Sequence, residues 1–424
     1  MNRIVDIYNE FPKKFWLIVA VSFIDRIGGT MLFPFFSLYI TEKFGVGMTE
    51  AGIVLGIFSI MGLVGQFIGG AITDRFGRRN LIIFGLVFSA LSTLSLAFVN
   101  KYAMLIPLAV IIGLLSDVAG PAHNAMIADI LDEKQRQEGF GILRVVANMS
   151  WIIGPTIGGF VANSSYLYLF IMDAVISCFV AFLFYMLISE TKPESTESEE
   201  HQSLFATFAG YGAVLKDKAF LAFLLAGMLM GMVYQQMYNS LSVYLRDVHS
   251  IEPQGYGFLL TSSAITVILF QFYTTRVIKK KPPFLMMALG TGFYMIGFAM
   301  FGFVSAYWLF VSAVVIITIG EMINMPTMQT LAANFAPESM RGRYMAAFGL
   351  IWMIPATISP ALAGIVLDNY NPNSLWYIGG VLCAVAALAF VTLHGKLGKQ
   401  KRFITKADEE DESAAAVIPA VQEA

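Results

Sequence analysis

The stretch Gly70-Ala-Ile-Thr-Asp74-Arg75-Phe-Gly77-Arg78-Arg79 separates two long apolar runs, residues 51–72 and 81–99. Each run is long enough to cross a bilayer as a helix, which takes roughly 20 residues. The stretch between them is therefore predicted to be a tight turn at the membrane surface. Its arginines indicate the cytoplasmic side, because basic residues accumulate in short cytoplasmic loops. Its glycines permit a sharp turn and a close approach of helices.

The composition extends this interpretation to the whole chain. Of 424 residues, 57% are hydrophobic and only 13% are charged, whereas soluble globular domains carry about 25% charged residues. The chain is therefore predicted to be an all-α membrane protein. Its net charge of -2 gives no reason to expect a nucleic-acid partner. Cys178 and Cys383 both lie in apolar runs and are predicted to be buried packing residues, not a disulfide or a metal site.

Twelve apolar segments can be counted along the chain. If the N-terminus is inside, only Lys43, Lys101 and Arg246 of the 27 Lys and Arg residues fall in outer loops. This bias predicts that both termini are cytoplasmic. No targeting signal is apparent, which favours a bacterial inner (plasma) membrane as the location. The predicted spans are residues 15–40, 50–72, 81–99, 103–127, 141–162, 166–188, 219–245, 255–275, 284–304, 307–331, 343–367 and 375–394.

The two halves of the chain resemble each other at an offset of 205 residues. The polar stretch 190–217 divides them and is predicted to be a cytoplasmic linker, in which residues 204–215 are candidates for an amphipathic surface helix. Residues 1–189 and 218–395 then form two six-helix bundles, and the tail, 396–424, is predicted to be disordered. The matching pairs are Gly52 and Gly257, Gln66 and Gln271, Pro121 and Pro326, and Pro155 and Pro360.

The turn that opened this section resembles the G-x-x-x-D-R-x-G-R-[KR] signature of the major facilitator superfamily, which lies between its second and third membrane helices. The resemblance covers nearly the whole chain. It implies twelve helices in two pseudo-repeat bundles and alternating access around a site near the bilayer midplane. It also implies that Asp74 lies against the start of helix 11, where a carboxylate is favourable. The residues assigned to this cytoplasmic gate motif are Gly70, Asp74, Arg75, Gly77, Arg78, Arg79 and Asp129.

Within this motif, Arg75 and Arg78 are expected to pair with Asp129 at the cytoplasmic end of helix 4. The simpler alternative is that the arginines only enforce topology. That alternative does not explain Asp74 or the two glycines, so we expect the motif to control conformational exchange.

Helix 5 carries a second motif, Gly141-x8-Ser150-x3-Gly154-Pro155-x-x-Gly158-Gly159. It resembles the G-x8-G-x3-G-P-x-x-G-G motif of facilitator antiporters, with Ser150 in place of the middle glycine. Serine is still small, so close packing against a neighbouring helix is preserved. The resemblance implies antiport, although Gly-Pro pairs also kink helices in transporters of either direction.

Ionisable side chains inside a membrane are costly and are functional candidates by default. Asp25, Asp117 and Glu321 lie near the middle of their predicted helices, whereas Asp173 lies nearer the outer surface on a helix expected to support the bundle. Arg144 is a candidate to neutralise Asp117. Each acid has the alternative role of a static partner for an arginine. The residues assigned to proton coupling or substrate binding are Asp25, Arg26, Asp117, Arg144, Glu321, Asn148, Gln235 and Gln236.

Two functional hypotheses follow from this set. The first is proton-driven efflux of small, lipophilic, cationic compounds, since the helix 5 motif and the midplane acids resemble those of drug:proton antiporters. The second is proton-coupled uptake of a sugar, organic acid or peptide, in which Arg26 and Arg144 bind an anionic group. No nucleotide-binding GxxxxGK[ST] is present, so neither ATP nor another cofactor is expected. By resemblance the protein is expected to be a monomeric transporter, not an enzyme, with lipid, protons and a small molecule as its partners.

Overall fold

The structure is a computed structural model, and it describes residues 8, 10–191, 214, 216–279, 281–337, 340–398, 400 and 403. Every regular element in these ranges is a helix. Twelve helical spans are long and apolar enough to cross a membrane, which confirms the number counted from the sequence. The expected amphipathic helix over residues 204–215 and the tail beyond residue 403 lie outside the described residues, apart from Val214.

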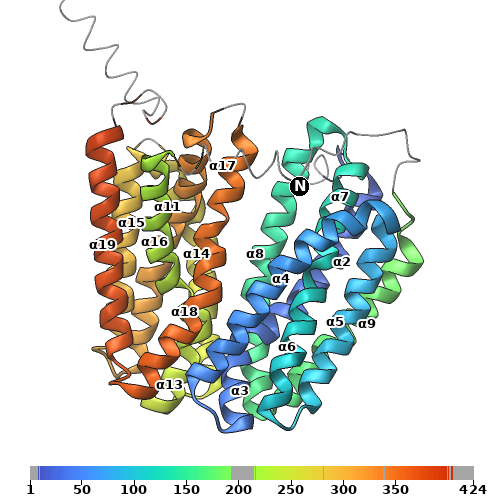
Figure 1. Cartoon of the computed structure of the whole chain (residues 1–424), viewed down its shortest axis with the longest axis horizontal. Coiled ribbons are helices and arrows are strands. Elements are labelled where there is room, and N and C mark those ends of the chain that lie inside the picture. The colour runs from blue at the N-terminus through green and yellow to red at the C-terminus, as the bar shows by residue number, and fades with distance from the viewer. Residues whose placement is uncertain are drawn as a thin grey trace, which may run out of the picture. The chain divides into compact units, whose positions relative to one another are not determined.

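The first six spans are formed by ten helical elements, which Figure 1 shows from blue to green. Four of these spans are single helices, and the first and the fourth are interrupted. The elements are α2 (Lys13–Leu32), η1 (Phe33–Phe35), α3 (Phe36–Phe44), α4 (Met48–Phe76), α5 (Arg78–Phe98), α6 (Tyr102–Ser116), η2 (Asp117–Ala119), α7 (Gly120–Ile130), α8 (Glu133–Ser164) and α9 (Tyr166–Leu187).

The described residues of the second half form nine helical elements, and here the seventh and eleventh spans are the interrupted ones. The elements are α11 (Lys218–Tyr234), α12 (Gln236–Asn239), α13 (Leu241–His249), α14 (Pro253–Ile278), α15 (Pro283–Phe301), α16 (Tyr307–Phe335), α17 (Arg341–Phe348), α18 (Leu350–Asn369) and α19 (Ser374–Leu397).

Several spans predicted to be continuous helices are interrupted. The first breaks into the 3-10 turn η1 at Pro34, because proline lacks a backbone N–H and disrupts the preceding helical turn. The fourth breaks at η2, just before Pro121. The seventh breaks at Gln235, where the side-chain amide of Gln236 donates to the carbonyl of Met232 at 2.8 Å and competes with the helical hydrogen bonds. Two of these breaks thus coincide with Asp117 and the Gln235–Gln236 pair.

The chain packs as two compact units. Unit 1 is built from described residues within Met1–Glu199, Tyr238–Thr261 and Pro360–Asp368. In it α2 packs on α8 and α9, α4 on α6, and α5 on α9. Unit 2 is built from described residues within Glu200–Met237, Ser262–Ser359 and Asn369–Ala424, and in it α15 packs between α16 and α19. Unit 1 therefore takes in short pieces of the second sequence half.

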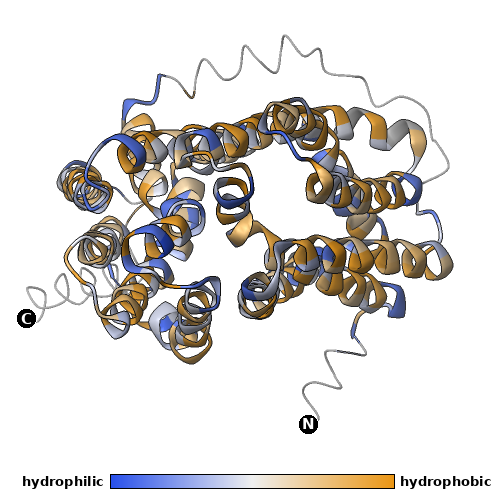
Figure 2. Cartoon of the chain, turned by 90° about the horizontal axis from the view of Figure 1, so that it is seen from below, coloured by the Kyte–Doolittle hydropathy of each residue, from blue (hydrophilic) through white to orange (hydrophobic). Residues whose placement is uncertain are grey.

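The surfaces of the helices are strongly apolar (Figure 2). Large side chains such as Phe67, Phe272 and Trp308 are 74%, 78% and 76% exposed, respectively. Exposed apolar area on this scale is unfavourable in water and natural in lipid. Cys383 is buried as predicted, but the prediction for Cys178 is wrong, because its position on α9 leaves it exposed on this apolar surface. Both cysteines are free.

Candidate functional site

The turn between α4 and α5 is held by a carboxylate that the sequence analysis did not assign. The Glu190 carboxylate accepts hydrogen bonds from the backbone N–H groups of Arg78 and Arg79, at 3.0 and 3.1 Å, and so caps the start of α5. Gly77, between the two helices, has φ +87°, which favours glycine. A Cβ added to Gly77 would also lie 2.5 Å from Oε2 of Glu190. Gly77 is therefore required both for the turn and for this cap.

The arginines of the turn make specific contacts within unit 1. Nε of Arg78 lies 3.0 Å from Oδ2 of Asp129, which is the ion pair expected from the sequence. Nε and Nη2 of Arg79 donate to the carbonyls of Ile188 and Tyr185, each at 2.7 Å. The turn is thus tied to the ends of α7 and α9. These contacts give the arginines a structural role beyond setting topology.

The remaining gate residues are not described at side-chain level. This applies to Asp74 and Arg75, and the surroundings of Gly70 are likewise outside the described part. The contact of Asp74 with the start of helix 11, and the pairing of Arg75 with Asp129, therefore stay predictions.

The Arg78–Asp129 pair should show energetic coupling. We expect the destabilisation of Arg78→Gln combined with Asp129→Asn to be about 1 kcal/mol smaller than the sum of the two single effects, because close ion pairs are non-additive. Thermal unfolding of the purified variants in detergent measures this. The matched control is Arg246→Gln with Glu42→Gln, whose charges lie 3.9 Å apart on more exposed side chains and should couple weakly. Simple additivity at Arg78 and Asp129 would contradict the prediction.

The helix 5 motif packs α8 against two other helices. A Cβ added to Gly154 would overlap Oγ1 of Thr30, and one added to Gly158 would overlap the carbonyl of Met31, so both glycines bring α8 close to α2. On the neighbouring face, a Cβ added to Gly159 would lie 3.1 Å from Cα of Gly257 on α14. These glycines therefore allow helix backbones to meet.

The other motif positions behave differently. Ser150 is fully buried, and its carbonyl accepts a hydrogen bond from Oγ1 of Thr30 at 2.9 Å, so the departure from glycine is accommodated at the α2 contact. Pro155 is buried inside α8, where its carbonyl lies 3.0 Å from a Cβ added to Gly257. Nothing lies within 4 Å of a Cβ added to Gly141. The packing role thus belongs to the second half of the motif.

Unit 1 brings two intramembrane acids together. Asp25 on α2 is half-buried, and Asp173 on α9 is only 5% exposed. Oδ1 of Asp173 lies 2.5 Å from a Cβ added to Gly28, one turn from Asp25, and its Oδ2 accepts a hydrogen bond from Thr93 at 2.7 Å. The two carboxyl groups interact electrostatically. Asp173, expected to have a supporting role, is therefore a neighbour of one of the assigned acids.

The other charged candidates of unit 1 are more accessible. Arg26 on α2 is exposed, as are Arg144 and Asn148, which lie four residues apart on α8 and so share a face. Asp117, in η2, is exposed at the surface of the unit, and Oδ2 lies 2.8 Å from a Cβ added to Gly62 of α4. The neutralisation of Asp117 by Arg144 stays a prediction.

Unit 2 places Glu321 next to Tyr234, whose ring packs against aromatic rings from two further helices. Glu321, on α16, is half-buried and shares a side-chain hydrogen bond with Tyr234 at the end of α11. The Tyr234 ring stacks on Tyr294 of α15 with centroids 5.6 Å apart and meets Trp352 of α18 edge-on at 5.9 Å. A carboxylate beside electron-rich rings is suited to a proton or an organic cation.

The two glutamines next to Tyr234 differ in burial. Gln236 is 5% exposed and donates to the carbonyl of Ser359 on α18 at 3.3 Å, so it stabilises the packing of the two helices. Gln235, at the break, is half-buried. Of the pair, Gln235 is therefore the better candidate for contact with a ligand.

Comparison with known proteins supports a transporter. The family model described as Major Facilitator Superfamily matches residues 18–360 and 251–420. The chain belongs to this superfamily. This facilitator is therefore a multi-pass transporter of the plasma membrane, and the match agrees with the twelve spans and the gate motif.

Its similarity to individual proteins is lower. A Na(+), Li(+), K(+)/H(+) antiporter of Planococcus maritimus is 29% identical over 78% of this chain and 84% of its own. The quinolone resistance protein NorA of Staphylococcus aureus is 21% identical over 89% of this chain and 96% of its own. Among solved structures, a POT family transporter in complex with 5-aminolevulinic acid has a TM-score of 0.75 at 15% identity, covering 91% of this chain and 96% of that one. At this identity, the similarity between the chain and the solved POT family transporter concerns the fold alone.

Some residues of these sites were missed from the sequence. Glu190 directly follows the last apolar run of the first half, and an acidic residue there is a usable signal for a cap on a neighbouring helix. Tyr294 and Trp352 gave no signal, because they come from helices far from Glu321 in sequence.

Proposed function

We propose that this facilitator couples the inward movement of protons to efflux of small lipophilic cations by alternating access. The observation that supports this most is the position of Glu321, hydrogen-bonded to Tyr234 and close to the ring cluster that includes Tyr294 and Trp352. Aromatic faces attract cations, and a carboxylate adds a full negative charge. A neutral ligand, by contrast, would not balance the charge of the carboxylate.

Exchange follows from competition for the same carboxylate. A proton neutralises Glu321, and a bound cation also satisfies its charge, so either ligand weakens the binding of the other. Reciprocal weakening of this kind is a coupling free energy between two ligands. Rocking of the transporter then carries protons in one direction and substrate in the other.

A second candidate function is the exchange of monovalent metal cations for protons. It is favoured by the buried Asp173 beside Asp25 in unit 1, since carboxylates are ligands for hard cations. The 29% identical relative named as a Na(+), Li(+), K(+)/H(+) antiporter supports the same proposal. In this version the acids of unit 1, and not Glu321, bind the cargo.

The test uses everted membrane vesicles that contain the full-length protein and are energised by NADH. Efflux predicts that the vesicles concentrate a cationic dye, and that a protonophore releases it. Cation exchange predicts instead that added Na⁺, Li⁺ or K⁺ collapses the pH gradient, with no dye accumulation.

Vesicles that lack the protein provide the baseline for both measurements. If neither dye nor metal cations respond, the efflux proposal is wrong. Accumulation of a nutrient in right-side-out vesicles would then support the uptake alternative, with Arg26 and Arg144 as the residues to substitute next.

A further inference from the structure

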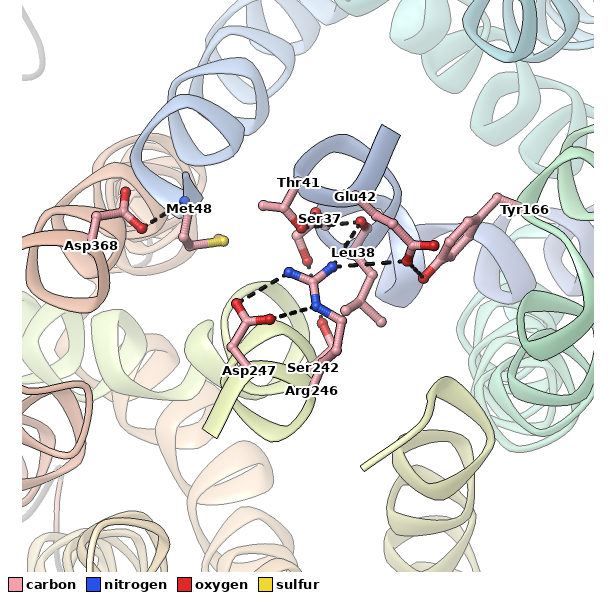
Figure 3. Close-up of polar contacts among 10 residues, drawn as sticks. All are labelled: Ser37, Leu38, Thr41, Glu42, Met48, Tyr166, Ser242, Arg246, Asp247 and Asp368. Carbon is pink, nitrogen blue, oxygen red and sulfur yellow. Dashed lines mark hydrogen bonds and ion pairs between the residues drawn. The ribbon is translucent and has the colours of Figure 1, made fainter. Parts of the chain in front are cut away.

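The start of α4 is capped by a carboxylate that belongs to α18. Oδ1 of Asp368 accepts a hydrogen bond from the backbone N–H of Met48 at 2.9 Å, and Oδ2 accepts from the N–H and the hydroxyl of Thr49 at 2.7 and 2.6 Å (Figure 3). The two helices are 320 residues apart in sequence. Met48, Thr49 and Asp368 all lie in unit 1. They are on the side of the membrane that the distribution of Lys and Arg assigns to the outside.

The local sequence of α4 makes this cap necessary. Its N-cap residue is Gly47, which has no side chain to accept hydrogen bonds from the first turn. A Cβ added to Gly47 would lie 2.5 Å from Oδ2 of Asp368. Glycine at this position therefore leaves the space that the Asp368 carboxylate occupies. The free N–H groups of the first turn and the helix dipole both favour an anion there. Asp368 therefore performs for α4 the role that its own N-cap cannot.

Glycines bring the two backbones together behind the cap. A Cβ added to Gly52 would overlap the backbone of Pro360, and a Cβ added to Gly364 would overlap the backbone of Thr49. The contact between α4 and α18 is thus dense along two turns. When the helices separate, the packing and the cap are lost together.

The internal repeat supplies a natural comparison. At the offset of 205, the contact of Gly52 with Pro360 corresponds to that of Gly257 with Pro155, which is also present in unit 1. Ser37 and Ser242, themselves 205 residues apart, face each other with their hydroxyl oxygens 3.4 Å apart. The same end of unit 1 therefore contains two pseudo-equivalent helix contacts.

The carboxylate that α18 supplies in the first contact is not repeated at the equivalent position of α8 in the second. The position equivalent to Asp368 is Asn163, which is uncharged, and α14 begins at Pro253, which has no N–H to donate. A polar tie in this second contact is the hydroxyl pair of Thr156 and Thr261, 2.6 Å apart. The charge-assisted cap is thus a specific addition to one copy of a repeated contact.

The nearby Arg246 cluster is a weaker tie between helices. Arg246 donates mainly to its sequence neighbour Asp247, at 2.7 and 3.1 Å (Figure 3). Its pair with Glu42 of α3 spans 3.9 Å, and the Glu42 side chain is 58% exposed. Exposed ion pairs with such geometry contribute little. The three short bonds of Asp368 are therefore the stronger connection at this end.

We propose that Asp368 is an outer latch, a carboxylate on α18 that caps α4 while the outer end is closed and has to release α4 for it to open. This rests on the alternating access of the proposed function. The latch is reversible because Asp368 is solvent-exposed, so water can replace the protein donors as the helices part. Its strength sets how often the transporter opens outward.

The test measures opening without any substrate. Cys178→Ser and Cys383→Ala remove the native thiols, and Ser242→Cys then introduces a reporter at a position that is 1% exposed in this structure. Labelling of intact cells by a membrane-impermeant maleimide reports outward opening. We expect Asp368→Asn to raise the labelling rate about ten-fold, which corresponds to about 1.4 kcal/mol in a two-state equilibrium.

Two further variants sharpen this test. Thr49→Val removes only the hydroxyl donor and should give a smaller increase. Glu252→Gln, which neutralises an exposed carboxylate between α13 and α14, should leave the rate unchanged. If Asp368→Asn folds, as judged by size-exclusion chromatography, and labels at the parental rate, the latch is wrong.

If that variant does not fold, an unchanged rate in Thr49→Val overturns the proposal. A failure of dye transport would contradict the proposed function without altering the labelling result, so the two failures are distinguishable.

Discussion

Replacing Glu321 by glutamine abolishes uphill dye efflux if the proposed coupling is correct. Glutamine keeps the shape of the side chain and its ability to hydrogen-bond to Tyr234, but it neither takes up a proton nor balances a cation. We expect the accumulation ratio in energised everted vesicles to fall by at least about five-fold, the lower end of typical coupling between two ligands. Downhill dye movement should be affected much less.

Two variants show whether this effect belongs to the carboxylate. Tyr234→Phe removes the hydrogen bond to Glu321 and leaves the charge, so we expect a smaller loss of efflux. Glu252→Gln neutralises an exposed acid outside the twelve spans and should transport like the wild type. Undiminished, protonophore-sensitive efflux by Glu321→Gln would show that the coupling site lies elsewhere, with Asp25 and Asp173 as the next acids to substitute.

The same substitution at two positions of the helix 5 motif should have opposite effects on stability. The Cβ of Gly154→Ala would overlap Thr30 of α2, so α8 would have to move, and overpacking of this kind costs about 1–3 kcal/mol. Gly141→Ala meets no atom within 4 Å and replaces glycine by a better helix former, which is worth up to about 1 kcal/mol.

Thermal unfolding of the purified protein in detergent measures both effects. We expect a lower midpoint for Gly154→Ala and an equal or higher midpoint for Gly141→Ala. Gly158→Ala, whose Cβ would overlap the carbonyl of Met31, should resemble Gly154→Ala. Equal midpoints for all three variants would mean that the motif does not act through close packing of α8 on α2.

Features that depend on local composition could be predicted from the sequence alone. Whether a segment crosses a membrane is decided by the summed hydrophobicity of about 20 consecutive residues, so the twelve spans could be counted directly. The internal repeat was also visible in the sequence, because equivalent residues of the two halves keep a constant offset of 205. The Arg78–Asp129 pair could be expected because both residues lie at the end of the unit assigned to the cytoplasm.

Which side chains meet across helices depends on how the helices pack, and the sequence did not predict it. Successive residues of a helix point about 100° apart, but the rotation of each helix about its own axis is set by packing against its neighbours. Hydropathy therefore could not show that Asp173 lies against Gly28, one turn from Asp25, or that Tyr294 and Trp352 pack on Tyr234, the partner of Glu321. Hydropathy also could not show that Asp368 caps α4, 320 residues away in sequence. The two helices meet through glycines, and glycine positions leave no recognisable pattern in hydropathy.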